Sequence, residues 1–428
     1  MDRTGIIKVA GILLTVPIVI QLVPGLVKPN IKYEFDGFCD QRFKDVQHVF
    51  KANFENGWEP EGAAFAVYYD GQRVVDLWGG FADRESGRNW EKDTVTCIFS
   101  TTKAVAALAA AMLVDRSYMS YDDLVTKYWP EFGQHGKDNL TIRAYLTHEA
   151  GLPFMREPIT YETITNRKLM GDLIAKSKPH WPPGTGPGYH AFTYGFLVDQ
   201  LLSRVEPQHR NLSTFLREEV LIPHNIDFSI GIKLSDHYRA TRYRLPTVWQ
   251  KLTSISDWVS LKGWYSFTRQ LSNPNSCLTK SVSAISQFEI AGLALFNDPK
   301  WAATEVAAAN GFSNARALAK LFSKVLGGKI VRSKELLSTL ATPLYDGIPD
   351  KCLLVPVSSG HGFWHWRPAK HDHFAFGHPG YGGQMAMMDP KYSLAYSYVT
   401  NGFGPSVVED RYKELEKSIY KCVKEIVG

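Results

Sequence analysis

Cysteine is scarce in this chain of 428 residues, which has five: Cys39, Cys97, Cys277, Cys352 and Cys422. They are too few and too scattered to predict a disulfide framework or a zinc site. Their odd number leaves at least one thiol outside any intrachain bridge. Spacings typical of metal ligands, such as H-E-x-x-H or paired C-x-x-C, are also missing. We therefore expect no metal site and no cofactor.

The sequence also lacks any concentration of charge of one sign. Its 48 basic and 43 acidic residues are interspersed and leave a net charge of +5. Without a basic stripe, a nucleic-acid partner is not expected. No internal repeat or long linker occurs, and 44% of the residues are hydrophobic. The chain is long enough for one large interleaved domain or two lobes. Nothing in the sequence indicates an oligomeric state.

The chain has one long uncharged run, the nineteen residues Val9 to Val27. That length just spans the bilayer core as a helix, and a spanning helix can tolerate Pro17 and Pro24. We predict that residues 1–30 form an N-terminal hydrophobic anchor or signal segment. A retained anchor that enters the membrane through residues 9–27 is favoured. A cleaved signal peptide and a buried amphipathic segment are the alternatives.

Positive charges flank this run on both sides, so the positive-inside rule does not settle its orientation. Two glycosylation sequons, Asn139-Leu-Thr141 and Asn211-Leu-Ser213, slightly favour a lumenal or extracellular location for the rest of the chain. We therefore expect a single-pass membrane protein with a lumenal or extracellular domain, and secretion is the alternative.

The stretch around Ser100 has the pattern of a strand followed by a buried helix. Residues 93–99 are short and partly β-branched, and residues 104–114 are almost all Ala, Val, Leu and Met. A spacing of three places Ser100 and Lys103 on one helical face, one turn apart. A lysine in a dry pocket can lose its proton and activate a serine hydroxyl, or can hold a second base ready.

The S-x-x-K pattern alone is not specific, because Ser418-Ile-Tyr-Lys421 also matches it. That second match lies on what the sequence predicts to be an exposed helix over residues 408–427. The apolar helix predicted behind Ser100 distinguishes the first match. Two further stretches downstream add to its weight.

The first of these stretches is a loop rich in glycine and proline, residues 181–188, which leads directly to Tyr189. A tyrosine at the start of a helix is well placed to point into a cleft. A nearby ammonium at Lys103 would lower the pKa of this phenol and let the phenolate act as a base. The alternative is a core or rim tyrosine. His148, in a predicted turn, is more typical of a structural hydrogen-bonding residue than of a base.

The second stretch is glycine-rich and covers residues 377–383, ahead of predicted strands at 384–388 and 394–399. Glycine allows the backbone to approach another group closely. N–H groups of this stretch could form an oxyanion hole together with the N–H of Ser100. The alternative is a glycine-rich bend that binds no ligand.

Together these motifs resemble the serine β-lactamase and penicillin-binding-protein superfamily, for which S-x-x-K is typical. Ser100-Thr-Thr-Lys103 matches the first motif. Tyr189-His-Ala191 matches the second, in the form seen among esterase-like relatives of class C enzymes. His378-Pro-Gly380 stands where the family has K-T-G or H-x-G. The resemblance covers residues 38–428.

The resemblance implies roles for these residues. Ser100 would be the acylated nucleophile, Lys103 its activator, and Tyr189 the general base and later proton donor. The N–H groups of Ser100 and Tyr381 would form the oxyanion hole. His378 and Gly380 would border the substrate.

The fold that the resemblance implies is α+β, with an antiparallel sheet flanked by helices and a mostly helical lobe over residues 120–280. The sheet would take strands from around residues 60–80 and 350–400. Ser100 would lie between the sheet and the helical lobe.

Two departures from the family's motifs indicate the substrate class. His378 replaces a lysine that supplies a fixed cation, and a histidine is mostly neutral at pH 7. Ala191 cannot donate a hydrogen bond to a substrate amide. We therefore expect a serine hydrolase that acts on a small ester, like a carboxylesterase, or on a small amide or peptide. The alternative is a catalytically silent scaffold or binding protein, although such a protein would have no need to keep Ser100, Lys103 and Tyr189.

Overall fold

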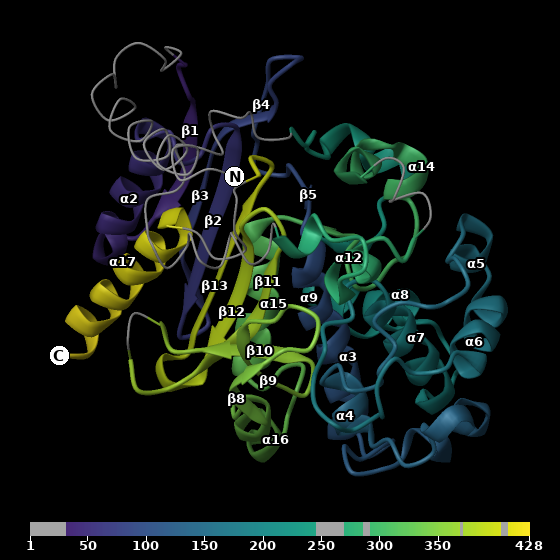
Figure 1. Ribbon diagram of the computed structural model, residues 1–428. Helices are drawn as coiled ribbons and strands as arrows, with labels where there is room; N and C mark the ends of the chain where they lie inside the picture. Colours follow the sequence, from purple (N-terminus) through teal and green to yellow (C-terminus); the bar gives the residue numbers. More distant parts are fainter. Residues whose placement is uncertain (1–30, 245–268, 286–291, 369–370, 404–409) are drawn as a thin grey trace, which may run out of the picture.

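The computed structural model describes residues 31–244, 269–285, 292–368, 371–403 and 410–428 (Figure 1). The hydrophobic segment predicted at residues 1–30 lies outside the described residues. Within the described part of the chain, no helix combines the length and the apolar character that crossing a membrane requires.

A large antiparallel sheet forms the centre of the molecule, in the order β1-β3-β2-β13-β12-β11-β10-β9-β8, with β4 paired to β3. The strands are β1 (Phe35–Cys39), β2 (Gly62–Tyr69), β3 (Gln72–Asp83), β4 (Arg88–Asn89), β8 (Tyr345–Pro349), β9 (Pro356–Gly360), β10 (Phe363–Trp366), β11 (Ala375–Gly380), β12 (Gln384–Asp389) and β13 (Leu394–Thr400). Strand β2 pairs with β13, which joins the two ends of the sequence at the middle of the sheet. The prediction that strands from both chain ends share one sheet is therefore confirmed.

The two faces of the sheet bury different side chains because successive residues of a strand point to opposite sides. In β2, Phe65 and Val67 belong to one core, whereas Ala64 and Ala66 belong to the other. The first face is covered by two helices, α2 (Lys44–Glu55) and α17 (Asp410–Val427). Figure 1 shows these two helices side by side on the left of the sheet. Helix α17 accounts for the helix predicted over residues 408–427.

The second face is covered by α3 (Thr102–Asp115) and α15 (Ala315–Leu326). Every residue of α3 from Thr102 to Leu113 is buried. A helix that is apolar all round is buried on all sides, which explains the run of alanine and leucine after Ser100. In Figure 1, α3 lies between the sheet and a helical region.

That helical region occupies the middle of the sequence. Its helices are α4 (Ile142–Leu146), α5 (Tyr161–Thr165), α6 (Arg167–Lys176), α7 (Thr193–Val205), α8 (Leu212–Leu216), α9 (Ile222–His224), α12 (Cys277–Val282) and α14 (Pro299–Ala302). Helix α12 ends at Val282, and a 3-10 helix covers Gly292–Asn297. A small sheet of β5 (Thr96–Cys97), β7 (Gly311–Ser313) and β6 (Phe228–Ile230) was not predicted.

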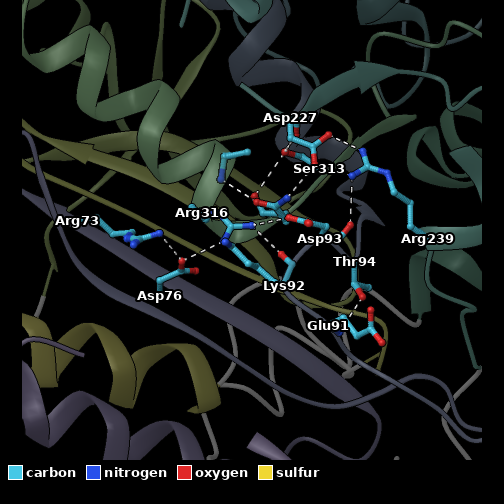
Figure 2. A network of polar contacts seen from close by, with 12 residues as sticks. Arg73, Asp76, Glu91, Lys92, Asp93, Thr94, Asp227, Arg239, Ser313 and Arg316 are labelled. Atoms are coloured by element: carbon cyan, nitrogen blue, oxygen red, sulfur yellow. Dashed lines mark hydrogen bonds and ion pairs between the residues drawn. The ribbon is translucent and has the colours of Figure 1, made fainter. Parts of the chain in front are cut away.

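A polar network fixes the chain segment that leads to β5 and then to Ser100 (Figure 2). Arg316, in the first turn of α15, donates to the buried Asp76 of β3 at 3.2 Å and to the carbonyl of Lys92 at 2.7 Å. Arg239 donates to Asp227 at 2.6 Å and to the carbonyl of Asp93 at 3.3 Å. These hydrogen bonds connect the segment both to the sheet and to the helical region.

A disulfide that the sequence did not predict joins Cys277, at the start of α12, to Cys352, in the connection between β8 and β9. The two cysteines are 75 residues apart in the sequence. The other three cysteines, Cys39, Cys97 and Cys422, are free thiols.

Candidate active site

Ser100 lies at a sharp turn where β5 gives way to α3. The preceding residue, Phe99, has a φ of +46°, in the left-handed region that non-glycine residues rarely adopt. The Phe99 ring is held by aromatic neighbours, with centroid distances of 4.7 Å to Phe296 and 5.4 Å to Tyr243. This packing stabilises the turn and leaves Ser100 half-buried at the start of a buried helix.

Lys103 is fully buried one turn further along α3. Its Nζ donates to the carbonyls of Ala191 and Ala308, each at 2.8 Å, and lies 3.2 Å from Ser100 Oγ. Burial lowers the pKa of this amine well below its usual value, because the charged form is poorly solvated there. A neutral amine has two N–H groups and one lone pair. The two carbonyls take the N–H groups, so the lone pair is free to face Ser100 Oγ.

Tyr189 approaches Ser100 from another side, and its hydroxyl donates to Ser100 Oγ at 2.7 Å. Its ring centroid lies 4.8 Å from Lys103 Nζ. Burial raises the pKa of this phenol. The prediction that an ammonium at Lys103 lowers the pKa of Tyr189 is therefore wrong, because burial acts on both groups and favours their neutral forms. Ser100 Oγ can accept a hydrogen bond from the tyrosine and donate one to the neutral amine.

Three buried side chains hold the backbone of the Tyr189-His190-Ala191 segment. Asp350 accepts from the N–H of Tyr189 at 3.0 Å, and Ser281 Oγ accepts from the N–H of Ala191 at 2.9 Å. His148 Nδ1 accepts from the N–H of His190 at 3.2 Å. Burial lowers the pKa of His148 well below its usual value, which keeps the ring neutral. This agrees with the structural role predicted for His148.

The end of strand β11 lies against the turn that carries Ser100. A Cβ added at Gly380 would lie 2.4 Å from the carbonyl oxygen of Ile98 and 2.8 Å from Thr101 Oγ1. A residue with a side chain could not approach so closely, which explains the glycine. The next residue, Tyr381, packs its ring 6.1 Å from that of Phe99. Gly380 and Tyr381 are thus both brought to the Ser100 turn.

His378 is almost completely buried on β11, with its ring centroid 4.9 Å from Trp364 and 6.1 Å from Tyr189. Burial, with a smaller contribution from Lys103, lowers the pKa of His378 to about 3. The third motif therefore supplies a neutral ring instead of a cation. The sequence predicted a histidine that is mostly neutral at pH 7, and burial makes it neutral at lower pH as well. No partner for Nε2 of His378 lies among the described residues.

Sequence reasoning missed Trp364, Ser281 and Asp350, because none of them belongs to a recognisable motif. No signal in the sequence could have found them, because nothing in their spacing relates them to Tyr189. Within the described residues, no group of His, Cys, Asp or Glu side chains is arranged to hold a metal ion.

The second S-x-x-K match has no such surroundings. Ser418 Oγ donates to the carbonyl of Leu415 at 2.9 Å, and Lys421 Nζ donates to Asp45 at 2.8 Å. Both residues lie on α17, on the face of the sheet opposite to α3. They differ from Ser100 and Lys103 in that the lysine is exposed and paired with a carboxylate.

Known proteins similar to this one share its length and fold. A protein described as esterase/beta-lactamase LipL from Mycobacterium tuberculosis (strain ATCC 25618 / H37Rv) is 32% identical over 381 residues, covering 87% of this chain and 85% of the relative. The crystal structure of a family VIII carboxylesterase has a TM-score of 0.78 and 28% identity, and covers 91% of this chain and 100% of its own. A penicillin-binding-protein homolog from Caulobacter crescentus has a TM-score of 0.73 and 32% identity, with the same coverage.

The family described as Beta-lactamase matches residues 50–419, which include all the residues brought together around Ser100. The match thus extends from helix α2 to helix α17 and takes in every strand of the central sheet except β1. The resemblance seen in the three motifs is therefore confirmed over most of the sequence, and the chain belongs to the beta-lactamase family.

Proposed function

We propose that this protein is a serine hydrolase that cleaves carboxylic esters through an acyl-enzyme on Ser100. The contacts of Lys103 carry the proposal. A buried amine whose N–H groups bind two carbonyls, and whose lone pair is left for a serine 3.2 Å away, is built to accept a proton. The esterase names of the similar proteins agree with it.

In the acylation step, Ser100 Oγ attacks the ester carbonyl carbon while its proton passes to Lys103 Nζ. The carbonyl oxygen becomes an oxyanion, which the N–H groups of Ser100 and Tyr381 stabilise. The carbon–oxygen bond to the alcohol then breaks, and Tyr189 donates its proton to the leaving alkoxide. Lys103 restores the proton of Tyr189. The 2.7 Å contact between Tyr189 and Ser100 supports this relay.

In the deacylation step, a water molecule attacks the acyl carbon and gives one proton to the same pair of groups. The bond between the acyl carbon and Ser100 Oγ breaks, the serine recovers its proton, and the carboxylic acid leaves. The oxyanion hole serves again, because the second tetrahedral intermediate has the same geometry as the first.

The substrate class follows from His378 and Ala191. A β-lactam requires the site to hold a carboxylate, and the buried neutral ring of His378 offers no charge for it. The methyl group of Ala191 offers no hydrogen bond to a side-chain amide. Each lost hydrogen bond costs about 1–3 kcal/mol. We expect kcat/KM for a short-chain aryl ester to exceed that for a chromogenic cephalosporin by at least about tenfold. A cephalosporin that is the better substrate would contradict this specificity.

The proposal also includes a location. Residues 9–27 anchor the protein in a membrane, and the hydrolase domain faces the lumen or the outside of the cell. The disulfide between Cys277 and Cys352 supports an oxidising compartment. After carbonate extraction, the full chain should stay with the membranes, and a chain that begins near Lys32 should be soluble. A mature N-terminus mapped within residues 20–35 would indicate cleavage and secretion instead.

A fluorophosphonate reagent, which reacts covalently with activated serines, tests the nucleophile. Ser100→Ala should abolish labelling. Ser418→Ala is the matched control, because Ser418 belongs to the second S-x-x-K match and should leave labelling intact. No labelling of the unmodified protein would favour the catalytically silent alternative.

A further inference from the structure

The two cysteines of the disulfide lie close in sequence to two residues that hold the Tyr189 segment. Cys352 comes two residues after Asp350, which accepts from the N–H of Tyr189. Cys277 comes four residues before Ser281, one turn earlier on α12, and Ser281 accepts from the N–H of Ala191. One covalent bond therefore joins the two supports of one short segment.

Asp350 organises its surroundings through one carboxylate oxygen. Its Oδ1 accepts from the N–H groups of Tyr189 at 3.0 Å, Cys352 at 2.8 Å and Leu353 at 2.7 Å. The residue is only 4% exposed. A buried carboxylate oxygen with three N–H donors is tightly held, because charge-assisted hydrogen bonds are strong. The half-cystine at 352 and the backbone of Tyr189 thus share a single acceptor atom.

Ser281 supports the other end of the segment. Its Oγ accepts from the N–H of Ala191 and donates to the carbonyl of Pro153, both at 2.9 Å. The carbonyl of Ala191 in turn accepts from Lys103 Nζ at 2.8 Å. Displacing this segment would therefore disturb both Tyr189 and one of the acceptors that orient Lys103.

We propose that Asp350 is a positioning residue for Tyr189, and that the Cys277–Cys352 disulfide fixes the positions of Asp350 and Ser281 relative to each other. A thiol reductant that breaks this disulfide therefore lowers the rate of acylation. This inference rests on the proposed function of Ser100. The disulfide reacts with two electrons and two protons from a dithiol to give two thiols and an oxidised reagent. Cys277 is half-buried, whereas Cys352 is fully buried, so attack would come at the Cys277 sulfur.

The expected size of the effect follows from geometry. The hydroxyl of Tyr189 lies 2.7 Å from Ser100 Oγ. A displacement of about 1 Å from a productive geometry can cost about 100-fold in rate. Asp350→Ala removes the shared acceptor, and we expect it to lower the rate of acylation about 10–100-fold. Asp350→Asn keeps an Oδ1 acceptor for all three N–H groups, and we expect it to stay within about threefold of the unmodified protein.

A double-mutant cycle shows whether Asp350 acts through Tyr189. The second-order rate constant of fluorophosphonate labelling at Ser100 would be measured for Asp350→Ala, Tyr189→Phe and the double variant. If Asp350 positions the Tyr189 hydroxyl, Asp350→Ala should have little further effect once that hydroxyl is gone. Equal losses in both backgrounds, or no loss in either, would overturn the proposal. Failure of the unmodified protein to label would instead contradict the proposed function itself.

The redox arm uses the full chain treated with dithiothreitol, with thermal unfolding followed in parallel to confirm that the reduced protein is folded. Labelling should slow about 10–100-fold on reduction and recover on reoxidation. The Cys39→Ser variant, which removes a free thiol, should respond like the unmodified protein. Full labelling by folded protein whose Cys277 and Cys352 are both alkylated would overturn the redox part. If Asp350→Ala does not fold, the reduced protein still decides: folded, reduced protein that labels at the unmodified rate would refute the coupling.

Discussion

The two faces of the sheet treat buried polar groups differently. On the face covered by α2 and α17, the hydroxyls of Tyr396 and Tyr412 donate to Glu416 at 2.9 and 2.8 Å, and Tyr420 donates to Asp389 at 2.7 Å. On the face covered by α3, several buried polar atoms have no partner among the described residues: the hydroxyls of Tyr121 and Tyr194, Nε2 of His148, and both ring nitrogens of His361.

This difference distinguishes a face that serves the stability of the fold from a face that holds the proposed active site. A buried polar group without a partner costs about 1–3 kcal/mol, so a surface that serves only the fold is expected to satisfy them. On the α2 and α17 face, carboxylates accept hydrogen bonds from the three buried tyrosine hydroxyls. The α3 face keeps several polar groups without partners, and Lys103 is buried there without a counterion, as far as the described residues go. Such departures from local rules are typical of functional sites.

The largest effect is expected when the α3 face loses its proton relay. Lys103→Ala and Tyr189→Phe should each lower kcat about 10²–10⁴-fold, the usual contribution of a general base. Because both groups bind the same oxygen, the double variant should be little worse than the more damaging single one. Steady-state kinetics on an aryl ester measure this. Fully multiplicative losses would show that the two residues do not share a proton path.

Acidification should lower kcat/KM, because it protonates Lys103 on the α3 face. The folded protein holds the pKa of Lys103 well below the usual 10.5, so the neutral amine, and with it kcat/KM, is lost as the pH falls through that lowered value. The pKa of His378 is about 3, so this histidine stays neutral at every pH well above 3. On the alkaline side the rate should reach a plateau, since burial raises the pKa of Tyr189. A pH–rate profile that falls again as the pH rises from about 8 to 10 would contradict this assignment.

The same group has a defined effect on stability. On unfolding, Lys103 regains its usual pKa and takes up a proton that the folded protein excludes. Its contribution to the free energy of unfolding therefore rises with pH up to about 10.5 and falls as the pH drops.

The opposite face is tested by Glu416, whose Oε1 accepts from Trp366 at 3.1 Å as well as from the two tyrosines. Glu416→Ala leaves these buried donors unpaired and should lower the free energy of unfolding by about 3 kcal/mol or more. Because Glu416 lies on the far side of the sheet, kcat of the folded protein should stay within about twofold. Chemical denaturation and kinetics on the same sample measure both. A large loss of kcat with unchanged stability would contradict the conclusion that this face serves stability and the α3 face serves the reaction.

The smallest effect is expected on the free energy of unfolding, when one tyrosine hydroxyl is removed from each face. Tyr412→Phe removes a hydroxyl that binds Glu416 and should cost about 1 kcal/mol of unfolding free energy. Tyr121→Phe removes a hydroxyl that has no partner among the described residues and should cost less than about 0.5 kcal/mol. Denaturation midpoints of the two variants give the contrast. Equal losses would mean that the Tyr121 hydroxyl is satisfied in solution by ordered water.

The sequence predicted the parts of the site that depend on local spacing. Ser100 and Lys103 are one helical turn apart, and the apolar run after them requires burial, so both followed from the pattern of residues. The sheet with strands from both chain ends was implied by the family that the three motifs resemble. The direction of the pKa of Tyr189 did not, because it depends on how deeply the folded chain buries the phenol and the amine.

Long-range supports could not be predicted either. Asp350 lies 161 residues from Tyr189, and Ser281 lies 90 residues from Ala191. No periodicity in a sequence encodes such a contact. The disulfide was missed for the same reason, since five scattered cysteines do not indicate which pair meets.

The pairing of β2 with β13 has a consequence for the synthesis of the protein. β2 is complete at Tyr69, whereas β13 begins at Leu394. At about 5–20 residues per second, a ribosome needs roughly 15–60 s to make the residues between them. Throughout that time the hairpin of β2 and β3 lacks its central neighbour, and α3 has no completed sheet to cover it. Lys103 then remains in water and protonated, so the nascent chain is expected to be chemically silent until its last strand docks.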